Sequence, residues 1–279
     1  MLPYPQIDPV ILEAGPFALR WYGLMYLIGF LASYSLVRRQ ITRHAVTSGV
    51  GGGDQSLDLD MEAELNHLDG LFLWLAIGVI VGGRLGYVLF YNLPYYLNHP
   101  FEILATWHGG MSFHGGAAGA MAAGWAYCIR HRINFWLWAD RFAVTAPIGL
   151  GFGRIGNFIN GELYGRPTNV PWAMIFPQGG PIPRHPSQLY EAFLEGILLF
   201  IILWPLSKRP WPHGRKLALF LMLYAIVRSV AELFREPDPQ LGFVLLGSLT
   251  MGQILSIGFF VLGLFLWWYL DRPLTSKSS

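Results

Sequence analysis

The sequence has little charge and almost no cysteine. Only 13% of its 279 residues are charged, about half of the roughly 25% found in soluble domains, whereas 53% are hydrophobic. A chain this apolar cannot cover itself with polar surface, which excludes the soluble, disordered, coiled-coil and collagen-like classes. The single cysteine, Cys128, excludes an intramolecular disulfide and a cysteine-rich metal site. The net charge of +2 is too small to favour a nucleic-acid partner.

Long apolar runs are the dominant feature of the chain. A transmembrane helix needs about 20 mostly apolar residues to cross roughly 30 Å of hydrocarbon. Seven segments fit this description: 19–37, 71–91, 112–129, 138–158, 189–206, 217–234 and 251–270. The sequence therefore predicts an all-α, polytopic integral membrane protein with about seven transmembrane helices, formed as one domain over residues 1–279.

Lys and Arg lie on one side of this expected arrangement. They follow the first, third, fifth and seventh segments, whereas residues 1–19 and 92–111 contain neither. Cytoplasmic loops carry an excess of these residues, so we expect the N-terminus outside and the C-terminus in the cytoplasm. Residues 44–69 are then expected to form a polar cytoplasmic loop. Residues 159–188, dense in Gly and Pro, form an external loop, and connections of this length are usually functional or disordered.

Ionisable and polar side chains interrupt the apolar segments. An Arg at the centre of a bilayer costs at least about 2.5–3.5 kcal/mol on insertion scales, so such residues suggest function. In the expected topology they converge on the outer half of the membrane: Tyr22, Tyr26, Arg84, His114, Arg154, Asn157, Asn160, Glu162, Gln188, Tyr190, Glu191, Tyr224, Arg228 and Glu232. The last three are spaced i, i+4 and i+8, which places them on one stripe of a helix.

A structural role is the alternative for each of these residues. Arg228 and Glu232 could form an ion pair that only stabilises the helices. Arg84 could snorkel to the interface, satisfy a neighbouring carbonyl or tie helices together. His114 lies near the membrane interface, and taken alone it is best interpreted as a packing histidine.

Taken together, the polar residues suit an amphiphile with an anionic head group. The planar guanidinium of Arg binds two phosphate oxygens at once, and Gly-rich turns expose backbone N–H groups beside it. A histidine is the natural proton acceptor near neutral pH. The chain has no Ser-His-Asp pattern, no HExxH motif and no paired intramembrane Asp, which argues against a protease.

One polar stretch is distinctive. Residues 153–165, GRIGNFINGELYG, resemble the signature of the bacterial prolipoprotein diacylglyceryl transferases, which has the form GRxGNFxNxExxG. Further stretches agree in order with that family: RWYGLMY at 20–26, GGRLGY at 82–87, HGGMSFHGG at 108–116, RHPSQLYE at 184–191, REPD at 235–238 and TMGQ at 250–253. The resemblance covers nearly the whole chain.

The resemblance implies an enzyme of the bacterial inner membrane that acts at its outer, periplasmic face. Such an enzyme transfers the diacylglyceryl group of phosphatidylglycerol to the lipobox cysteine thiol of a preprolipoprotein signal peptide. Glycerol-1-phosphate is released, and the transfer is the first step of lipoprotein maturation. The family uses no metal and no organic cofactor. Its partners are therefore the lipid bilayer, phosphatidylglycerol and the signal peptide.

The family's functional residues map onto this sequence by motif. The catalytic candidates are His114, which matches an essential histidine, Arg154 of the signature, and Arg228 of the Tyr-x-x-x-Arg-x-x-x-Glu stripe. The substrate-binding candidates are Tyr22, Arg84, Arg154, Asn157, Asn160, Glu162, Gly165, Tyr224 and Glu232. We expect His114 to deprotonate the thiol and the two catalytic arginines to hold the phosphate. Glu162 and Glu232 are expected to orient the arginines.

A transporter or channel for an anionic metabolite is the alternative function. The same arginines would then line a path through the membrane. That function predicts polar residues continuing to the cytoplasmic side, whereas the inner halves of the expected spans are almost wholly apolar. The sequence therefore favours the transferase.

Overall fold

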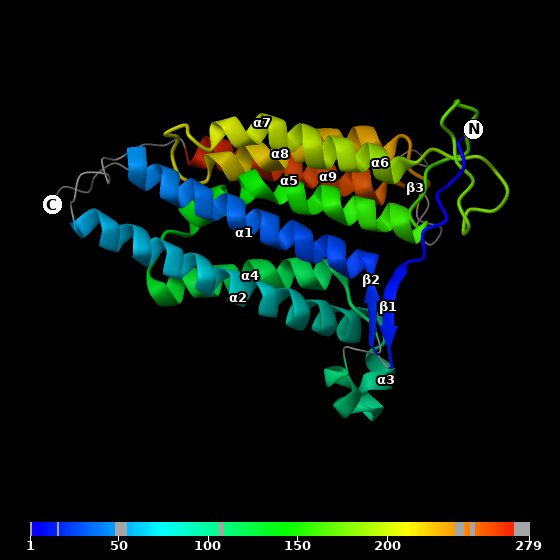
Figure 1. Ribbon diagram of the computed structural model, residues 1–279, viewed down its shortest axis with the longest axis horizontal. Coiled ribbons are helices and arrows are strands. Elements are labelled where there is room, and N and C mark those ends of the chain that lie inside the picture. Colours follow the sequence, from blue (N-terminus) through cyan, green and yellow to red (C-terminus); the bar gives the residue numbers. More distant parts are fainter. Residues whose placement is uncertain are drawn as a thin grey trace. The chain divides into compact units, whose positions relative to one another are not determined.

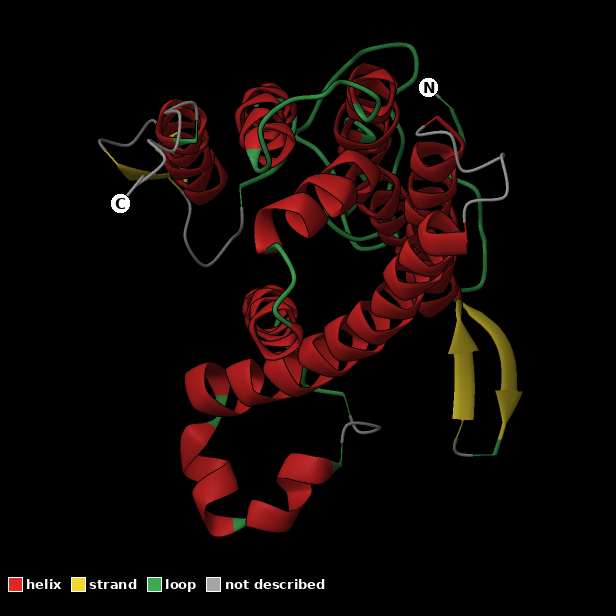
Figure 2. Ribbon diagram, turned by 90° about the vertical axis from the view of Figure 1, so that its left-hand side faces the viewer, coloured by secondary structure: helices red, strands yellow, loops and turns green. Residues whose placement is uncertain are grey.

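Helices build most of the described chain (Figure 1). The computed structural model describes residues 2–15, 17–47, 55–105, 109–237, 243–245 and 249–270. The chain falls into two compact units, of which the first combines Met1–Val37 with Ala139–Ser279 and the second is Arg38–Trp138. Figure 2, coloured by secondary structure, shows how little of the described chain is strand.

The first unit begins with an antiparallel hairpin that was not predicted. Strand β1 (Val10–Ala14) pairs with β2 (Phe17–Arg20), and helix α1 (Trp21–Thr47) follows β2 without a break. The residues of α1 up to Val37 belong to this unit. A Gly-Pro pair separates the two apolar runs in the sequence, which is a turn signal.

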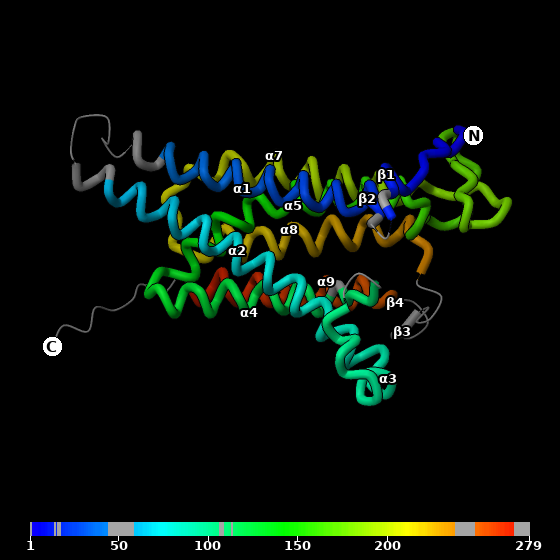
Figure 3. The backbone as a smooth tube through the Cα atoms, turned by 60° about the horizontal axis from the view of Figure 1, so that its bottom comes forward, coloured from blue at the N-terminus to red at the C-terminus, as the bar shows by residue number. Residues whose placement is uncertain are grey.

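The other elements of the first unit are mainly helices. They are α5 (Phe135–Asn160, from Ala139 onward), α6 (Ser187–Glu191), the π-helix η4 (Ala192–Leu198), α7 (Leu199–Leu206), α8 (Arg215–Glu232) and α9 (Met251–Tyr269). The short strands β3 (Phe243–Leu245) and β4 (Leu249–Thr250) pair before α9. Helices α6, η4 and α7 follow one another without a break (Figure 3). Helix α8 packs against all three of them and against α9.

Apolar packing and polar contacts both join these helices. The fully buried side chains of the core cluster are Val144, Leu199 and Leu203. Six partly buried side chains pack against them: Trp204, Leu219, Phe220, Leu223, Tyr224 and Val227. Asp140 of α5 accepts hydrogen bonds at 2.8 Å from the backbone N–H groups of Gly214 and Leu217. The carboxylate thus satisfies two free donors at the start of α8 and fixes α8 to α5.

The second unit is built around two closely packed helices. Its elements are the end of α1, α2 (Gln55–Tyr91), α3 (Leu93–Asn98), the 3-10 helix η2 (Pro100–Leu104) and α4 (Phe113–His131). Glycines face one another where α2 and α4 meet. A Cβ on Gly86 would lie 2.7 Å from the Cα of Gly115, and one on Gly82 would meet the backbone of Gly115 and Gly119. Small residues let membrane helices approach this closely.

Among the described residues, four helical segments are long and apolar enough to cross a membrane. They are Leu59–Tyr91, Phe135–Asn160, Ser187–Leu206 and Met251–Tyr269. The all-α class and the apolar spans of a membrane protein are thereby confirmed. The other expected spans, 19–37, 112–129 and 217–234, fall on α1, α4 and α8. Membrane crossing by these three and the orientation of the termini stay predictions.

The loop expected over residues 44–69 is largely helical. Helix α1 continues to Thr47 and α2 starts at Gln55, whereas residues 48–54 lie outside the described residues. The prediction inferred a loop from the acidic residues, but a polar segment can also form an amphipathic helix. Met61, Leu65 and Leu68 recur at helical spacing, and Leu68 is fully buried.

The external loop expected over 159–188 is an ordered segment. It is slightly shorter than predicted, because its first and last residues belong to helices. Helix α5 extends to Asn160 and α6 begins at Ser187. Between them, isolated bridges pair Pro167 and Met174 with Arg184. Phe176 is fully buried, and its ring contacts those of Tyr4 and Phe158, so the segment packs against α5 and the N-terminal residues.

Candidate active site

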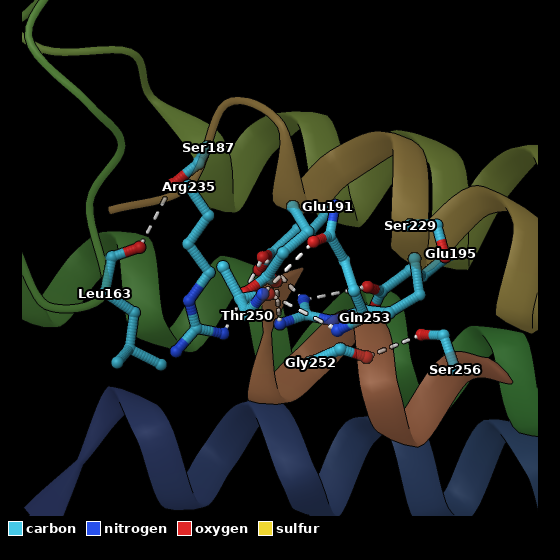
Figure 4. A network of polar contacts seen from close by, with 12 residues as sticks. Leu163, Ser187, Glu191, Glu195, Ser229, Arg235, Thr250, Gly252, Gln253 and Ser256 are labelled. Carbon is cyan, nitrogen blue, oxygen red and sulfur yellow. Dashed lines mark hydrogen bonds and ion pairs between the residues drawn. The ribbon is translucent and has the colours of Figure 1, made fainter. Parts of the chain in front are cut away.

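Two arginines and two glutamates of the first unit form a closed arrangement of opposite charges. Arg228 of α8 places its Nη1 2.7 Å from Glu191 Oε1 and 3.2 Å from Glu195 Oε1. Arg154 of α5 places its Nε 3.1 Å from Glu191 Oε2 and 3.2 Å from Glu195 Oε2. Each carboxylate therefore bridges both guanidinium groups, with one oxygen toward each; Figure 4 shows Glu191 and Glu195 in this network.

The two arginines are engaged to different extents. The side chains of Glu191 and Glu195 are 0% exposed, that of Arg228 is 10% exposed and that of Arg154 is 17% exposed. Arg228 uses two nitrogens on three carboxylates, because its Nη2 also lies 2.7 Å from Glu232 Oε2. Arg154 is held through Nε alone, and its terminal nitrogens have no other partner among the residues that the structure describes. Terminal amino groups of an arginine can donate two parallel hydrogen bonds to an anion.

Glu232 connects the network to the start of α9. A Cβ on Gly252 would lie 2.9 Å from both carboxylate oxygens of Glu232, so the carboxylate lies against the first turn of α9. A capping box fixes that turn: the Gln253 N–H donates to Thr250 Oγ1 at 3.3 Å, and the Thr250 N–H donates to Gln253 Oε1 at 3.1 Å (Figure 4). The positive end of the helix dipole stabilises a carboxylate at this position.

A third arginine brings the network to formal neutrality. Arg235 Nη1 lies 3.9 Å from Glu191 Oε1. The network then holds three arginines, 154, 228 and 235, and three glutamates, 191, 195 and 232. Buried charges are tolerated only when they are paired in this way.

The end of α5 carries a second polar cluster. Asn157 Nδ2 donates to Glu162 Oε1 at 2.8 Å, and Asn160 Nδ2 donates to the same oxygen at 3.3 Å. Gln188 Nε2 donates to the backbone carbonyl of Glu162 at 2.7 Å. The expectation that Glu162 orients the arginines was wrong, because it holds two asparagines. The chain reverses at Gly161, which has a φ of 68°, and this turns Glu162 back onto the last turn of α5.

Gly165 lies where two chain segments pass each other. Its N–H donates to the carbonyl of His185 at 2.9 Å, and it forms an isolated bridge with Arg235. A Cβ on Gly165 would lie 2.5 Å from the Phe234 carbonyl oxygen and 2.6 Å from that of His185. No larger residue fits, so close backbone packing explains this glycine of the signature.

Tyrosine hydroxyls from α1 and α8 border the charged residues. The hydroxyls of Tyr22 and Tyr26 lie 3.1 Å apart. The ring of Tyr22 packs on the signature, since a Cβ on Gly156 would be 3.0 Å from its Cδ2. Tyr224 interacts electrostatically with Glu195, Arg154 and Arg228. Tyr22 therefore lies against the signature and Tyr224 lies near the charged network. Their roles in substrate binding stay predictions.

Arg84, in the second unit, is fully occupied by the backbone. Its Nε donates to the carbonyl of Ile103 at 2.8 Å. Nη1 donates to the carbonyls of Gly109 and Gly110, and Nη2 to those of Glu102 and Ala105, at distances between 2.6 and 3.1 Å. These five bonds use all five N–H groups of the guanidinium, which leaves none for a head group. Arg84 was interpreted either as a substrate-binding residue or as a structural one. The structure favours the structural role, in which Arg84 satisfies neighbouring carbonyls.

His114 lies in the first turn of α4. The preceding Ser112 caps this helix, accepting at its Oγ from the Gly115 N–H at 3.2 Å. The backbone N–H of Ser112 donates to the carbonyl of Gly83 at 2.8 Å, which ties the helix start to α2. His114 is exposed, as a base for an incoming thiol must be. Its role as a base stays a prediction.

An apolar groove is formed by residues of the loop after α5, of α6 and η4, and by Phe234 after α8. It has a volume of about 430 Å³ and is lined by Val170, Trp172, His185, Leu189, Tyr190, Phe193, Leu194 and Phe234. The Trp172 indole N–H donates to the Tyr190 hydroxyl at 2.6 Å, and that hydroxyl lies 3.1 Å from His185 Nδ1. Because its polar atoms satisfy one another, the groove presents an apolar surface.

His185 and Tyr4, which lie outside the expected spans, have shifted pKa values. Burial lowers the pKa of His185 from its ordinary value, and burial raises the pKa of Tyr4. The Tyr4 hydroxyl donates to the carbonyls of Phe158 and Ile159 at 2.7 and 3.0 Å. Both groups are therefore uncharged at neutral pH.

The sequence-based site omitted two of its most buried members. Glu191 and Glu195 have no assigned role in that prediction, although each contacts two arginines. The available signal was their spacing, because two acids four residues apart in an apolar segment share one helical face. Within the described ranges, no three His, Cys, Asp or Glu side chains are grouped so that they could hold a metal ion.

Comparison with known proteins assigns the family. The model of the family described as prolipoprotein diacylglyceryl transferase matches residues 9–269. The chain belongs to this family. A phosphatidylglycerol–prolipoprotein diacylglyceryl transferase from Desulfotalea psychrophila is 55% identical over 271 residues, covering 95% of this chain and 94% of that protein. Proteins of the same name from Nitratidesulfovibrio vulgaris and Pseudomonas fluorescens are 51% and 48% identical, covering 95% and 100% of this chain and 95% and 99% of their own lengths.

In this member of the prolipoprotein diacylglyceryl transferase family, the predicted site residues fall into three groups. Arg154, Arg228, Tyr224 and Glu232 share one network in the first unit. Tyr22, Asn157, Asn160, Glu162 and Gly165 lie on or against the family signature of the same unit. His114 and Arg84 belong to the second unit.

Proposed function

We propose that this protein transfers the diacylglyceryl group of phosphatidylglycerol to the lipobox cysteine thiol of a preprolipoprotein signal peptide. The transfer releases glycerol-1-phosphate and is the first step of lipoprotein maturation. Family membership over residues 9–269 supports the reaction class. The observation that carries the proposal is Arg154, whose terminal amino groups have no partner among the described residues although its Nε is held by two buried glutamates.

The arginine pair is proposed to bind the head-group phosphate. An arginine that is anchored at Nε can donate two parallel hydrogen bonds from its terminal nitrogens to two phosphate oxygens. Arg228 adds positive charge within the same network. Because both guanidinium groups are fixed before the lipid binds, they stabilise charge that develops on the leaving phosphate without reorganising.

The reaction is proposed to be a direct displacement. The thiolate sulfur attacks the glyceryl carbon that bears the phosphate, so a carbon–sulfur bond forms as the carbon–oxygen bond breaks. The bond electrons leave with the phosphate oxygen of glycerol-1-phosphate. A free thiol has a pKa near 8.5 and is mostly protonated at neutral pH, so a base is needed. His114 is proposed to accept the thiol proton.

The protein is proposed to work as one catalytic domain with seven spans in the bacterial inner membrane. An N-terminus outside and a C-terminus in the cytoplasm would place the site at the periplasmic face, where both substrates are available. The four apolar helical segments support a membrane location. The loop after α5, folded against the end of α8 through the Gly165 and Arg235 bridge, would cover this side of the site.

A transfer assay tests the proposal directly. Purified protein, phosphatidylglycerol and a synthetic lipobox peptide are combined, and thiol loss and glycerol-phosphate release are followed together. Equal appearance of both products in the wild type is expected, with loss of both in a folded Arg154→Ala variant. Arg130→Ala, which removes an exposed arginine of α4, is the matched control. No transfer by well-folded wild type would favour the transport of an anionic metabolite instead.

A further inference from the structure

Glu195 occupies an unusual place in its helix. It is fully buried within η4, the π-helical stretch Ala192–Leu198, in an otherwise apolar segment. Single π-helical turns inside α-helices occur frequently at functional sites. A buried carboxylate in a membrane span is costly, so its presence needs a compensating role.

Close backbone packing brings Glu195 to Arg154. The next residue, Gly196, lies against Gly151 of α5: a Cβ on Gly196 would be 2.7 Å from the Cα of Gly151. Arg154 follows Gly151 by three residues on α5, which places the two on the same helical face. The approach of η4 to α5 at this glycine pair thus allows Glu195 Oε2 to reach Arg154 Nε at 3.2 Å.

The contact fixes one end of the guanidinium and leaves the other end available. Glu195 Oε2 accepts from Arg154 Nε, and Glu195 Oε1 accepts from Arg228 Nη1 at 3.2 Å. The neighbouring Glu191 lies near Arg154 Nε as well, but its Oε2 accepts no hydrogen bond from any described residue. Glu195 is therefore the carboxylate that receives the Arg154 Nε hydrogen bond.

We infer that Glu195 is a positioning residue for head-group binding, which orients Arg154 so that its terminal amino groups meet the phosphate of phosphatidylglycerol. This inference rests on the proposed function. Glu195 does not touch the lipid; it acts through Arg154. The same carboxylate links Arg154 to Arg228, so one side chain sets the relative orientation of both phosphate-binding groups.

The charge of the network lets one substitution distinguish an effect of charge from an effect of orientation. Replacing Glu195 by Gln keeps the shape but changes the formal balance of three arginines and three glutamates to a net positive charge. Simple attraction would then strengthen phosphatidylglycerol binding and lower KM. Lost orientation of Arg154 would weaken binding and raise KM. The two effects therefore change KM in opposite directions.

The experiment compares Glu195→Gln, Glu195→Asp and the control Glu102→Gln. Glu102 is a carboxylate of the second unit that accepts from the Tyr95 hydroxyl, outside the network. For each protein we measure KM and kcat for phosphatidylglycerol, and the shift in Tm caused by phosphatidylglycerol relative to neutral diacylglycerol. For Glu195→Gln we expect KM to rise by about tenfold and the lipid-specific Tm shift to be mostly lost. Glu195→Asp, which keeps the charge, should recover part of both, and Glu102→Gln should match the wild type.

The outcomes separate the inference from a folding effect and from the proposed function. A lower Tm without lipid, but wild-type KM and a wild-type lipid-specific shift, would mean that Glu195 is only structural and would overturn the inference. A lower KM would overturn it too. If Glu195→Gln does not fold, Glu195→Asp decides instead. Aspartate keeps the charge, but its side chain is one methylene shorter and draws the carboxylate back from Arg154. A fully wild-type KM in Glu195→Asp would therefore equally overturn the inference. A wild type that binds the lipid without transferring it removes the proposed reaction, and the Tm shift still decides on Glu195. A wild type that neither binds nor transfers the lipid would overturn both the proposed function and the inference about Glu195.

Discussion

Gly252 and Glu232 are in such close contact that a single methyl group would not fit between them. A Cβ on Gly252 would lie 2.9 Å from both carboxylate oxygens of Glu232. Glu232 in turn holds Arg228 at 2.7 Å, one helical turn earlier on α8. The absence of a side chain at the start of α9 therefore helps to set the position of an arginine on another helix.

Gly252→Ala should lower the transfer rate by about tenfold or more, because the new methyl group must displace the Glu232 carboxylate from Arg228. Gly258→Ala in the same helix is the matched control, since nothing lies within 4 Å of a Cβ there. Alanine at that control position should favour the helix by roughly 0.5–1 kcal/mol relative to glycine. Transfer rate and Tm are measured for both variants. Wild-type rates in both would mean that Glu232 tolerates displacement.

Arg84→Gln should destabilise the fold rather than weaken lipid binding. The variant leaves several partly buried carbonyls between Glu102 and Gly110 without their charged donor, at a cost of about 2–4 kcal/mol. The Tm in detergent checks this, and KM for phosphatidylglycerol should be unchanged in the protein that remains folded. Arg130→Gln at an exposed position of α4 should change stability by less than about 0.5 kcal/mol. A raised KM with wild-type Tm would instead make Arg84 a lipid ligand.

Conservative substitutions should distinguish the roles proposed for Arg154 and Arg228. Arg154→Lys should lower kcat/KM by about 100-fold with little loss of Tm, because lysine can still meet the glutamates but has no planar fork for phosphate. Arg228→Lys should lower both quantities, since Arg228 holds three carboxylates through two nitrogens. Steady-state rates and thermal unfolding of the two variants test the contrast. Full turnover by Arg154→Lys would rule out a bidentate contact at that residue.

His185 should make stability depend on pH. Burial lowers its pKa in the folded protein below the ordinary value of about 6.5. The unfolded chain then binds the proton more readily, so the stability from neutral His185 is fully present above about pH 6.5 and is lost as the pH falls toward the folded pKa. Tm measured between pH 7 and 5 should fall less steeply in His185→Gln than in the wild type. His99→Gln, at an exposed histidine, should keep the wild-type slope, and equal slopes in all three proteins would contradict the prediction.

Helix placement was largely predictable because the apolar runs that form spans are a local property of the chain. Each expected span falls on a helix or on a continuous run of helices. The errors occurred where polarity was equated with a loop: residues 55–69 are helical despite their acidic residues. The β1–β2 hairpin was also missed, because strand pairing depends on contacts that a hydropathy pattern does not encode.

The sequence by itself determined the membrane class, the positions of the apolar helices and the family, because composition, apolar length and motif spacing are all local. Only the tertiary structure decided which charges meet. It assigned Arg84 to backbone carbonyls and Glu162 to two asparagines, and it gave Arg154 and Arg228 a shared pair of buried glutamates. The physical reason is that a guanidinium or carboxylate has several possible partners along the chain, and the close packing of helices at glycine contacts selects among them.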